Sequence, residues 1–242
     1  MPELGHFFMD TYDITRLSIA LLAILIIAIV FFNKIVFKKS KLTTLFLTRT
    51  AIFAALSILL YTIPFLKFSV PFFPAFLELH FDEVPALIAT FAYGPLSGTF
   101  IILIKTLVKL PMTTSLCVGE LADLLYGLCL VIPAGFIYKK KRNIKGALIG
   151  LGISTLIQLV VSCFFTTFVI LPFYMNVMGL SEQAILSMCQ AINPGVTSLS
   201  WPFLFIVALP FNLFKDAIVI AITFLLYKRL YRLINRLSAQ KN

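Results

Sequence analysis

The stretch GALIGLGISTLIQLVVSCFFTTFVIL, residues 146–171, is predominantly apolar and holds no charged side chain. About 20 such residues are enough for an α-helix to cross a bilayer. The whole chain has the same character, since 60% of its 242 residues are apolar and only 12% are charged. The mean hydropathy is +1.02. A soluble domain needs more charge to cover its surface, so the sequence predicts an all-α polytopic membrane bundle.

Glycine and proline residues divide the chain into further apolar segments. Predicted spans lie at 17–37, 50–63, 82–93, 96–110, 118–138, 146–171 and 203–227. Two intervening segments are predicted to be irregular, 64–81 and 172–202, and the first of them is broken by three prolines. The sequence therefore predicts a bundle with little chain outside the membrane.

Basic residues are concentrated in three segments, 34–49, 139–145 and 228–241, which hold 15 of the 20 Lys and Arg residues. Such segments face the cytoplasm. The opposite side has only Arg16 and Lys67. An odd number of spans then puts the N-terminus outside and the C-terminus in the cytoplasm. The formal charge of +10 is therefore interpreted as a topology signal, and nucleic-acid binding is not expected.

Six charged residues fall within or at the ends of predicted spans: Lys105, Lys109, Glu120, Asp123, Lys215 and Asp216. A charge inside a bilayer is costly and normally faces a partner or a water-filled cavity. Lys105 and Lys109 share one helix face, as do Glu120 and Asp123, so neighbouring helices could pair them. Two interpretations stay open at this point. These residues form structural ion pairs, or they line a polar pocket that binds a small polar molecule.

Metal and enzyme signatures are absent from the sequence. The four cysteines and two histidines show no metal-binding or redox spacing, so we predict neither a metal nor a cofactor. Patterns of zinc peptidases, serine hydrolases and phosphate-binding loops are also missing, and no enzyme is expected. Uphill transport would need energy from a partner or an ion gradient.

Six short motifs occur in a characteristic order. They are FLELHFDEVPALI (76–88), YGPLSG (93–98), GELAD (119–123), ILPFY (170–174), AINP (191–194) and LPFNLFK (209–215). From about residue 50 onward the chain thus resembles the S-components of energy-coupling-factor (ECF) transporters, most closely the riboflavin-specific type. The resemblance implies a six-helix S-component at 46–242. Residues 1–45 would then form an additional transmembrane helix and a basic linker.

The resemblance also implies a set of partners. S-components bind a vitamin and dock on a transmembrane coupling protein that carries two cytoplasmic ATPases. Docking uses an Ala-x-x-x-Ala face, which Ala51 and Ala55 match. Small residues one turn apart let helices approach closely in lipid. ATP-driven toppling of the bundle would then expose the pocket to the cytoplasm.

A binding site for riboflavin or a related flavin is implied on the last helix, where Asn212 and Lys215 match the Asn-x-x-Lys of riboflavin-type members. An amide and an ammonium suit the carbonyls and nitrogens of a flavin ring. Since Asp216 points about 100° away from Lys215, we expect Lys215 to find its acceptor across the bundle, in Asp123 or in the ligand. Segment 64–81 resembles the extracellular lid of the family.

Five positions depart from the riboflavin-type pattern. Asparagine is common where this chain has Thr106, Asp123 and Thr166, and the lid usually reads Lys and Asp where Glu78 and His80 stand. These changes alter which donors and acceptors face the ligand. The predicted substrate-binding residues are Thr106, Glu120, Asp123, Thr166, Asn212 and Lys215.

Two alternatives to a riboflavin-binding subunit remain at this stage. The ligand could be a flavin nucleotide or another vitamin, because amide positions of the family pattern are changed. The chain could instead be a membrane scaffold subunit that binds no soluble ligand. The absorbance spectrum of purified protein distinguishes them, since a bound flavin is yellow.

Overall fold

The structure, a computed structural model, describes the backbone of residues 43–239 and the side chains of residues 43–229. The predicted additional helix at 17–37 lies outside the described residues. The division into 1–45 and 46–242 therefore stays a prediction.

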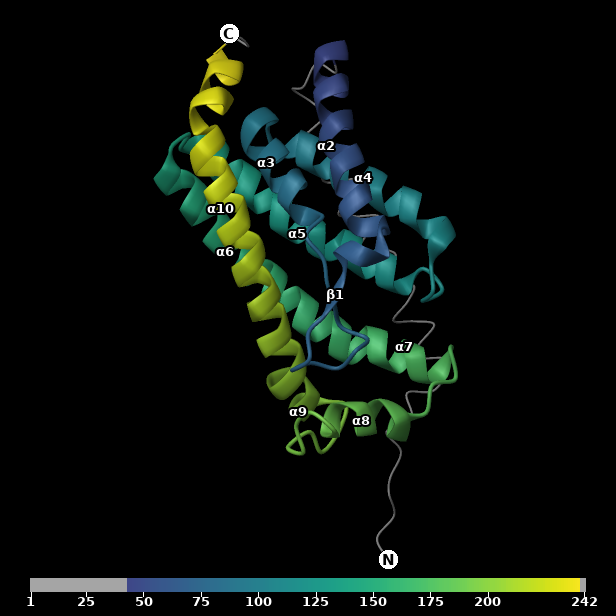
Figure 1. Cartoon of the computed structure of the whole chain (residues 1–242). Helices are drawn as coiled ribbons and strands as arrows, with labels where there is room; N and C mark the ends of the chain where they lie inside the picture. Colours follow the sequence, from purple (N-terminus) through teal and green to yellow (C-terminus); the bar gives the residue numbers. More distant parts are fainter. Residues whose placement is uncertain (1–42, 240–242) are drawn as a thin grey trace, which may run out of the picture. The chain divides into compact units, whose positions relative to one another are not determined.

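Five helical segments of the described part are long and apolar enough to cross a membrane (Figure 1). They are α2 (Thr44–Thr62), α4 (Pro95–Lys109) with the 3₁₀ turn η3 (Leu110–Met112), α5 (Val118–Lys140), α6 (Ile144–Phe165) with η4 (Thr166–Ile170) and α7 (Leu171–Asn176), and α9 (Trp201–Phe203) with η5 (Leu204–Ala208) and α10 (Leu209–Ala239). A shorter apolar helix, α3 (Glu83–Tyr93), lies among them. The all-α polytopic prediction is confirmed for the described residues.

Local capping explains where several helices begin. The Thr43 hydroxyl accepts a hydrogen bond from the Phe46 amide at 3.3 Å before α2, and the Asn143 side chain accepts one from the Gly146 amide at 2.7 Å before α6. Gly94 has φ +102° and joins α3 to α4, a conformation that glycine adopts without strain.

Helix α3 is enclosed by its neighbours, since its residues from Glu83 to Phe91 are all buried. Its 11 residues span only about 16 Å at 1.5 Å per residue, roughly half of the hydrocarbon core of a bilayer. A Cβ at Gly98 on α4 or at Gly135 on α5 would clash with Thr90 of α3. Glycine therefore permits the close packing of these three helices, and α3 begins inside the bundle.

The segment between α2 and α3 forms a small hairpin, which we call the lid (residues 64–81). It contains η2 (Pro64–Leu66), β1 (Phe68–Ser69) and β2 (Glu78–Leu79), and the two strands pair antiparallel. Aromatic contacts fasten it, because Phe73 packs on Phe211 with ring centroids 5.3 Å apart and Phe76 stacks on Phe203. The prediction that this segment is not a transmembrane helix is confirmed.

The prediction of an irregular segment at 172–202 is wrong in two places. The helix of α6 runs on to Asn176 in spite of Pro172, and residues Glu182–Gln190 form the helix α8. The π-helical turn η4 lies immediately before Pro172. Proline has no backbone N–H to donate, and a π turn changes the hydrogen-bond register, so the helix continues past the proline. The π turn η5 precedes Pro210 in the same way.

Candidate functional site

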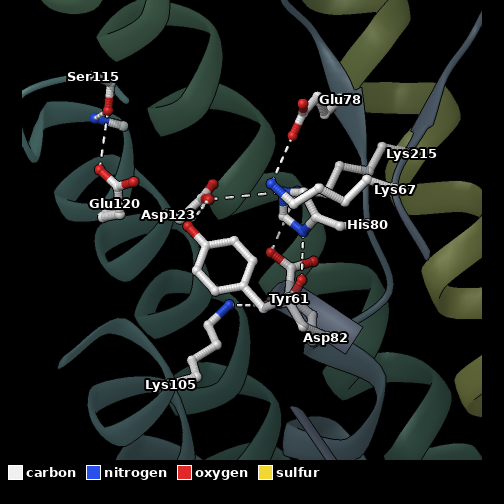
Figure 2. Close-up of polar contacts among 12 residues, drawn as sticks. Tyr61, Lys67, Glu78, His80, Asp82, Lys105, Ser115, Glu120, Asp123 and Lys215 are labelled. Atoms are coloured by element: carbon white, nitrogen blue, oxygen red, sulfur yellow. Dashed lines mark hydrogen bonds and ion pairs between the residues drawn. The ribbon is translucent and has the colours of Figure 1, made fainter. Parts of the chain in front are cut away.

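Charged side chains from the lid and from α3, α4, α5 and α10 meet beside the lid (Figure 2). Helices α2 and α4 end near this point, whereas the residues from α3, α5 and α10 lie within the first two turns of their helices. We call this group the buried charge cluster, and its members are His80, Asp82, Glu83, Lys105, Asp123 and Lys215.

The innermost pair of the cluster is Asp82 and Lys105, and both residues are completely buried. The Lys105 ammonium donates to one Asp82 oxygen, and His80 Nδ1 contacts the other. The expectation that Lys105 pairs with an acid of α5 is wrong. Asp82 takes this place because it stands directly before the first turn of the short helix α3, where the positive end of the helix dipole favours a carboxylate.

The second acid of the cluster, Asp123 on α5, is held by α2 and the lid. The Tyr61 hydroxyl donates to Asp123 Oδ2 at 2.5 Å, and His80 Nε2 lies 3.7 Å from the same oxygen. The rings of Tyr61 and His80 meet edge to face, with centroids 5.4 Å apart. Asp123 therefore lies at the predicted site, but its partners are a tyrosine and a histidine rather than a lysine.

Lys215 on α10 is buried, with only 4% of its surface exposed. Its Nζ lies 3.6 Å from Glu83 Oε1 and 3.5 Å from His80 Nε2. The expectation of an acceptor across the bundle is confirmed, but the residue is Glu83 instead of Asp123. The second Glu83 oxygen, Oε2, is buried and has no hydrogen-bond partner among the described residues.

Asp216 does not share the face of Lys215, as expected from the helix period. With the Gln158 amide oriented so that its nitrogen faces α10, this nitrogen lies 2.9 Å from both Asp216 oxygens. Asp216 is therefore satisfied by α6, and Lys215 is left to the cluster.

Asn212 and Thr166 both lie beside π turns. The Asn212 amide donates to the Ala208 carbonyl at 2.8 Å, at the end of η5. Thr166 opens η4, and its hydroxyl is 3.0 Å from the Tyr126 hydroxyl. π turns are frequent at functional sites, and these two bring polar side chains of neighbouring helices to the lid end of the bundle.

Glu120 and Thr106 are engaged elsewhere. Glu120 accepts hydrogen bonds from Thr113 at 2.7 Å and Ser115 at 3.0 Å, in the loop before α5 (Figure 2). The Thr106 hydroxyl donates to the Ile102 carbonyl of its own helix at 2.9 Å. Their role in substrate binding stays a prediction.

A groove of about 470 Å³ opens between the lid tip and the end of α8. Phe72 and Phe73 of the lid, Asn193 of the AINP motif and Val207 of η5 are among its lining residues. Its volume is within the range of small-molecule sites. The groove and the charge cluster thus both border the lid.

One face of α2 has no protein neighbour in the described part of the chain. Ala51 and Ala55 are exposed on it, whereas Ala54 and Ser57 on the opposite face are buried. The small residues singled out in the sequence therefore lie where a second helix could approach.

Sequence reasoning missed Tyr61, Asp82 and Glu83 as partners in the site. A signal was present in HFDE (80–83), where three titratable residues precede a strongly apolar helix. Their role depends on which helices enclose the start of α3, and this is a property of the packed bundle.

A lid over a polar cluster inside a polytopic helical bundle defines a membrane component that captures a small solute. The chain belongs to the family "ECF transporter, substrate-specific component", whose model matches residues 45–227. This confirms the resemblance proposed from the motifs.

Two curated relatives are similar over most of their length. "Riboflavin transporter RibU" of Staphylococcus aureus (strain TCH60) is 32% identical over 182 residues, which cover 75% of this chain and 89% of the relative. "Riboflavin transporter FmnP" of Bacillus subtilis (strain 168) is 26% identical over 188 residues, covering 75% and 91%.

The fold is also similar to a solved structure, described as "Structure and mechanism of the S component of a bacterial ECF transporter". The TM-score is 0.59 at 30% identity, with 78% of this chain and 96% of that chain covered. The chain is therefore a multi-pass membrane protein with the S-component fold.

Proposed function

We propose that this chain is the riboflavin-binding subunit of an ECF transporter. The observation that carries the proposal is the buried Lys215 ammonium, which lies one turn after Asn212 and faces Glu83 and His80. A buried cation of this kind marks a functional site in a membrane protein. The curated relatives bear the name riboflavin transporter, and the Asn-x-x-Lys pattern of that type is present.

The chemistry of these residues suits a flavin. The Lys215 ammonium donates hydrogen bonds to ring carbonyls, and the Asn212 amide both donates and accepts. Phe73 and Phe76 in the lid offer aromatic surface that can cover the ring. A polar anchor within an otherwise aromatic wall is the usual composition of a small-molecule site.

The charge balance favours riboflavin over a flavin nucleotide. The cluster holds three carboxylates, Asp82, Glu83 and Asp123, against the two ammonium groups of Lys105 and Lys215. A phosphate brought next to it would meet an excess of negative charge in a site of low polarity. An uncharged vitamin carries no such cost.

Replacing Asn212 or Lys215 by alanine tests the proposal. We expect each change to weaken riboflavin binding by about 1–3 kcal/mol, the usual cost of leaving a buried partner unsatisfied. Quenching of flavin fluorescence by purified variants measures it. Leu213→Ala is the matched control, because Leu213 is on the same helix and 55% exposed. Unchanged affinity in both site variants would contradict the assigned role, and no binding by the wild type would contradict the proposed ligand.

The partners of the subunit are a transmembrane coupling protein and two cytoplasmic ATPases, since an S-component has no ATPase of its own. We propose that the Ala51 and Ala55 face of α2 docks on the coupling protein. Its exposure in the described part of the chain supports this, because small residues allow close helix approach in lipid.

We further propose that the N-terminus is outside and the C-terminus in the cytoplasm. The basic segments at 139–145 and 228–241 then face the cytoplasm, and the lid faces outward. A reporter fused after Asn242 should be active in the cytoplasm, and one fused before Met1 should be active outside. Both ends on one side would contradict this orientation, in which the lid and the short helix α3 together bring the chain back across the membrane.

A further inference from the structure

We propose that His80 is a positioning residue for Lys215: it holds the lysine ammonium while its ring is neutral and releases the ammonium to the ligand when the ring is protonated. This rests on the proposed function, because Lys215 is taken as a ligand-binding group. His80 stands where riboflavin-type members usually have aspartate, so the device belongs to this chain's own sequence.

The His80 ring lies between a cation and an anion. Its Nε2 is 3.5 Å from Lys215 Nζ and 3.7 Å from Asp123 Oδ2. Its other nitrogen, Nδ1, contacts Asp82. The rings of Tyr61 and His80 meet edge to face, with centroids 5.4 Å apart. The ring is 6% exposed, so its orientation is fixed by these neighbours.

Two protonation states give Nε2 two different partners. With the Nδ1 proton donated to Asp82, the neutral ring presents a lone pair at Nε2, and this lone pair accepts from the Lys215 ammonium. A second proton turns Nε2 into a donor. The positive ring then forms an ion pair with Asp123, whose Oδ2 is 3.7 Å from Nε2, and it repels Lys215. Protonation therefore replaces the contact with Lys215 by attraction to Asp123.

The surroundings of His80 tolerate the additional positive charge. Four titratable groups contact the His80 ring: Tyr61 of α2, Asp82 before α3, Asp123 of α5 and Lys215 of α10. Further charged groups contact these four: Lys67, Lys105 and Lys109 lie over the Tyr61 ring, Glu78 pairs with Lys67, Glu83 pairs with Lys215, and Asp216 lies near Lys215. Within the buried charge cluster the three carboxylates outnumber the two ammonium groups. A protonated His80 makes the cluster electrically neutral, which lowers the cost of burying it.

Ligand binding and proton binding are then linked. A flavin carbonyl shares the three N–H donors of the Lys215 ammonium with Glu83 and neutral His80. A protonated His80 no longer accepts from Lys215, so one more N–H is left for the ligand. If protonation of His80 strengthens riboflavin binding, then bound riboflavin must favour protonation of His80 by the same factor. A change of pH in solution therefore tests the linkage.

The pH profile of binding tests the inference. Riboflavin affinity of the purified full chain should rise about five- to tenfold from pH 7.5 to pH 5.5, a coupling at the lower end of the range usual between two sites. His80→Gln should bind with a flat profile, because glutamine can still accept from Lys215 but cannot be protonated. Glu182→Gln, which changes an exposed acid in the first turn of α8, should keep the wild-type profile. A flat wild-type profile, or a His80→Gln profile like that of the wild type, would overturn the proposal.

A second measurement needs no ligand. The chain has two histidines, so NMR of histidine-labelled protein gives two ring signals, and His80→Gln identifies the one from His80. Its titration midpoint should move to higher pH in Lys215→Gln and to lower pH in Asp123→Asn. If Lys215→Gln does not fold, Asp123→Asn decides alone, and an unmoved midpoint there would overturn the proposal. A wild type that binds no riboflavin at any pH refutes the proposed function, whereas shifted midpoints would still support the positioning of Lys215 by His80.

Discussion

Riboflavin uptake by the assembled transporter should be abolished in Ala51→Leu, while the isolated subunit still binds riboflavin. Ala51 and Ala55 are exposed one turn apart on α2. Helices in lipid associate through close packing of small residues, because no hydrophobic effect operates between them there. A leucine at this position would hold the coupling protein's helix away. The residue makes no contribution to the lid or the charge cluster, so binding should be retained.

The matched control for this experiment is Gly152→Leu. Gly152 is on the exposed face of α6, where an added Cβ meets no atom within 4 Å. The substitution adds the same side chain to a lipid-facing position of another helix, and uptake should persist. Uptake by Ala51→Leu at the wild-type rate would refute α2 as the docking face, and so would equal loss in both variants.

Lys105→Ala should lower the free energy of unfolding by about 3–5 kcal/mol, the cost of breaking a buried ion pair by removing one partner. Lys105 and Asp82 are completely buried, and the Lys105 ammonium also lies 4.8 Å from the centre of the Tyr61 ring. Its loss leaves the Asp82 carboxylate with His80 as its remaining close partner. Denaturant unfolding of purified protein in detergent, followed by circular dichroism, measures the change.

An exposed ion pair on the lid serves as a control, because it shows how much of the stability loss at Lys105 is due to burial of the pair. Lys67 and Glu78 lie 2.7 Å apart with side chains 18% and 48% exposed, and Lys67→Ala should cost less than about 1 kcal/mol, as is usual for exposed pairs. Adding Asp82→Asn to Lys105→Ala should restore part of the lost stability, because the unpaired charge is removed. Equal costs at Lys67 and Lys105 would show that the buried pair has no special role in stability.

Much of the bundle follows from the order of residues along the chain. The run at 146–171 is apolar and long enough for a spanning helix, and prolines 64, 71 and 74 exclude a spanning helix in the lid. Asn212 and Lys215 are three residues apart, so their common helix face is a property of the helical period alone. The family could be recognised because its motifs are local and ordered.

The continuation of two helices past a proline depends on backbone hydrogen bonds that cannot be predicted from residue types. Proline ordinarily ends a helix, and the sequence alone therefore predicted an end near Pro172. The π turns η4 and η5 carry the helices past Pro172 and Pro210. Because a π turn results from one shifted hydrogen bond within an apolar helix, the residues themselves do not reveal it.

The sequence by itself determined the membrane environment, the approximate spans, the family, and the two polar residues that share one face of the last helix. Only the tertiary structure decided which charges pair. Lys105 binds Asp82, and Lys215 faces Glu83 and His80. The sequence had offered Glu120 or Asp123 as possible partners for Lys105, and Asp123 or the ligand for Lys215. The physical reason is that α3 is too short to cross the bundle. The acids at its start, Asp82 and Glu83, therefore lie between α4, α5 and α10. They contact Lys105 and Lys215 directly, in the places where acids of α5 could have paired with them.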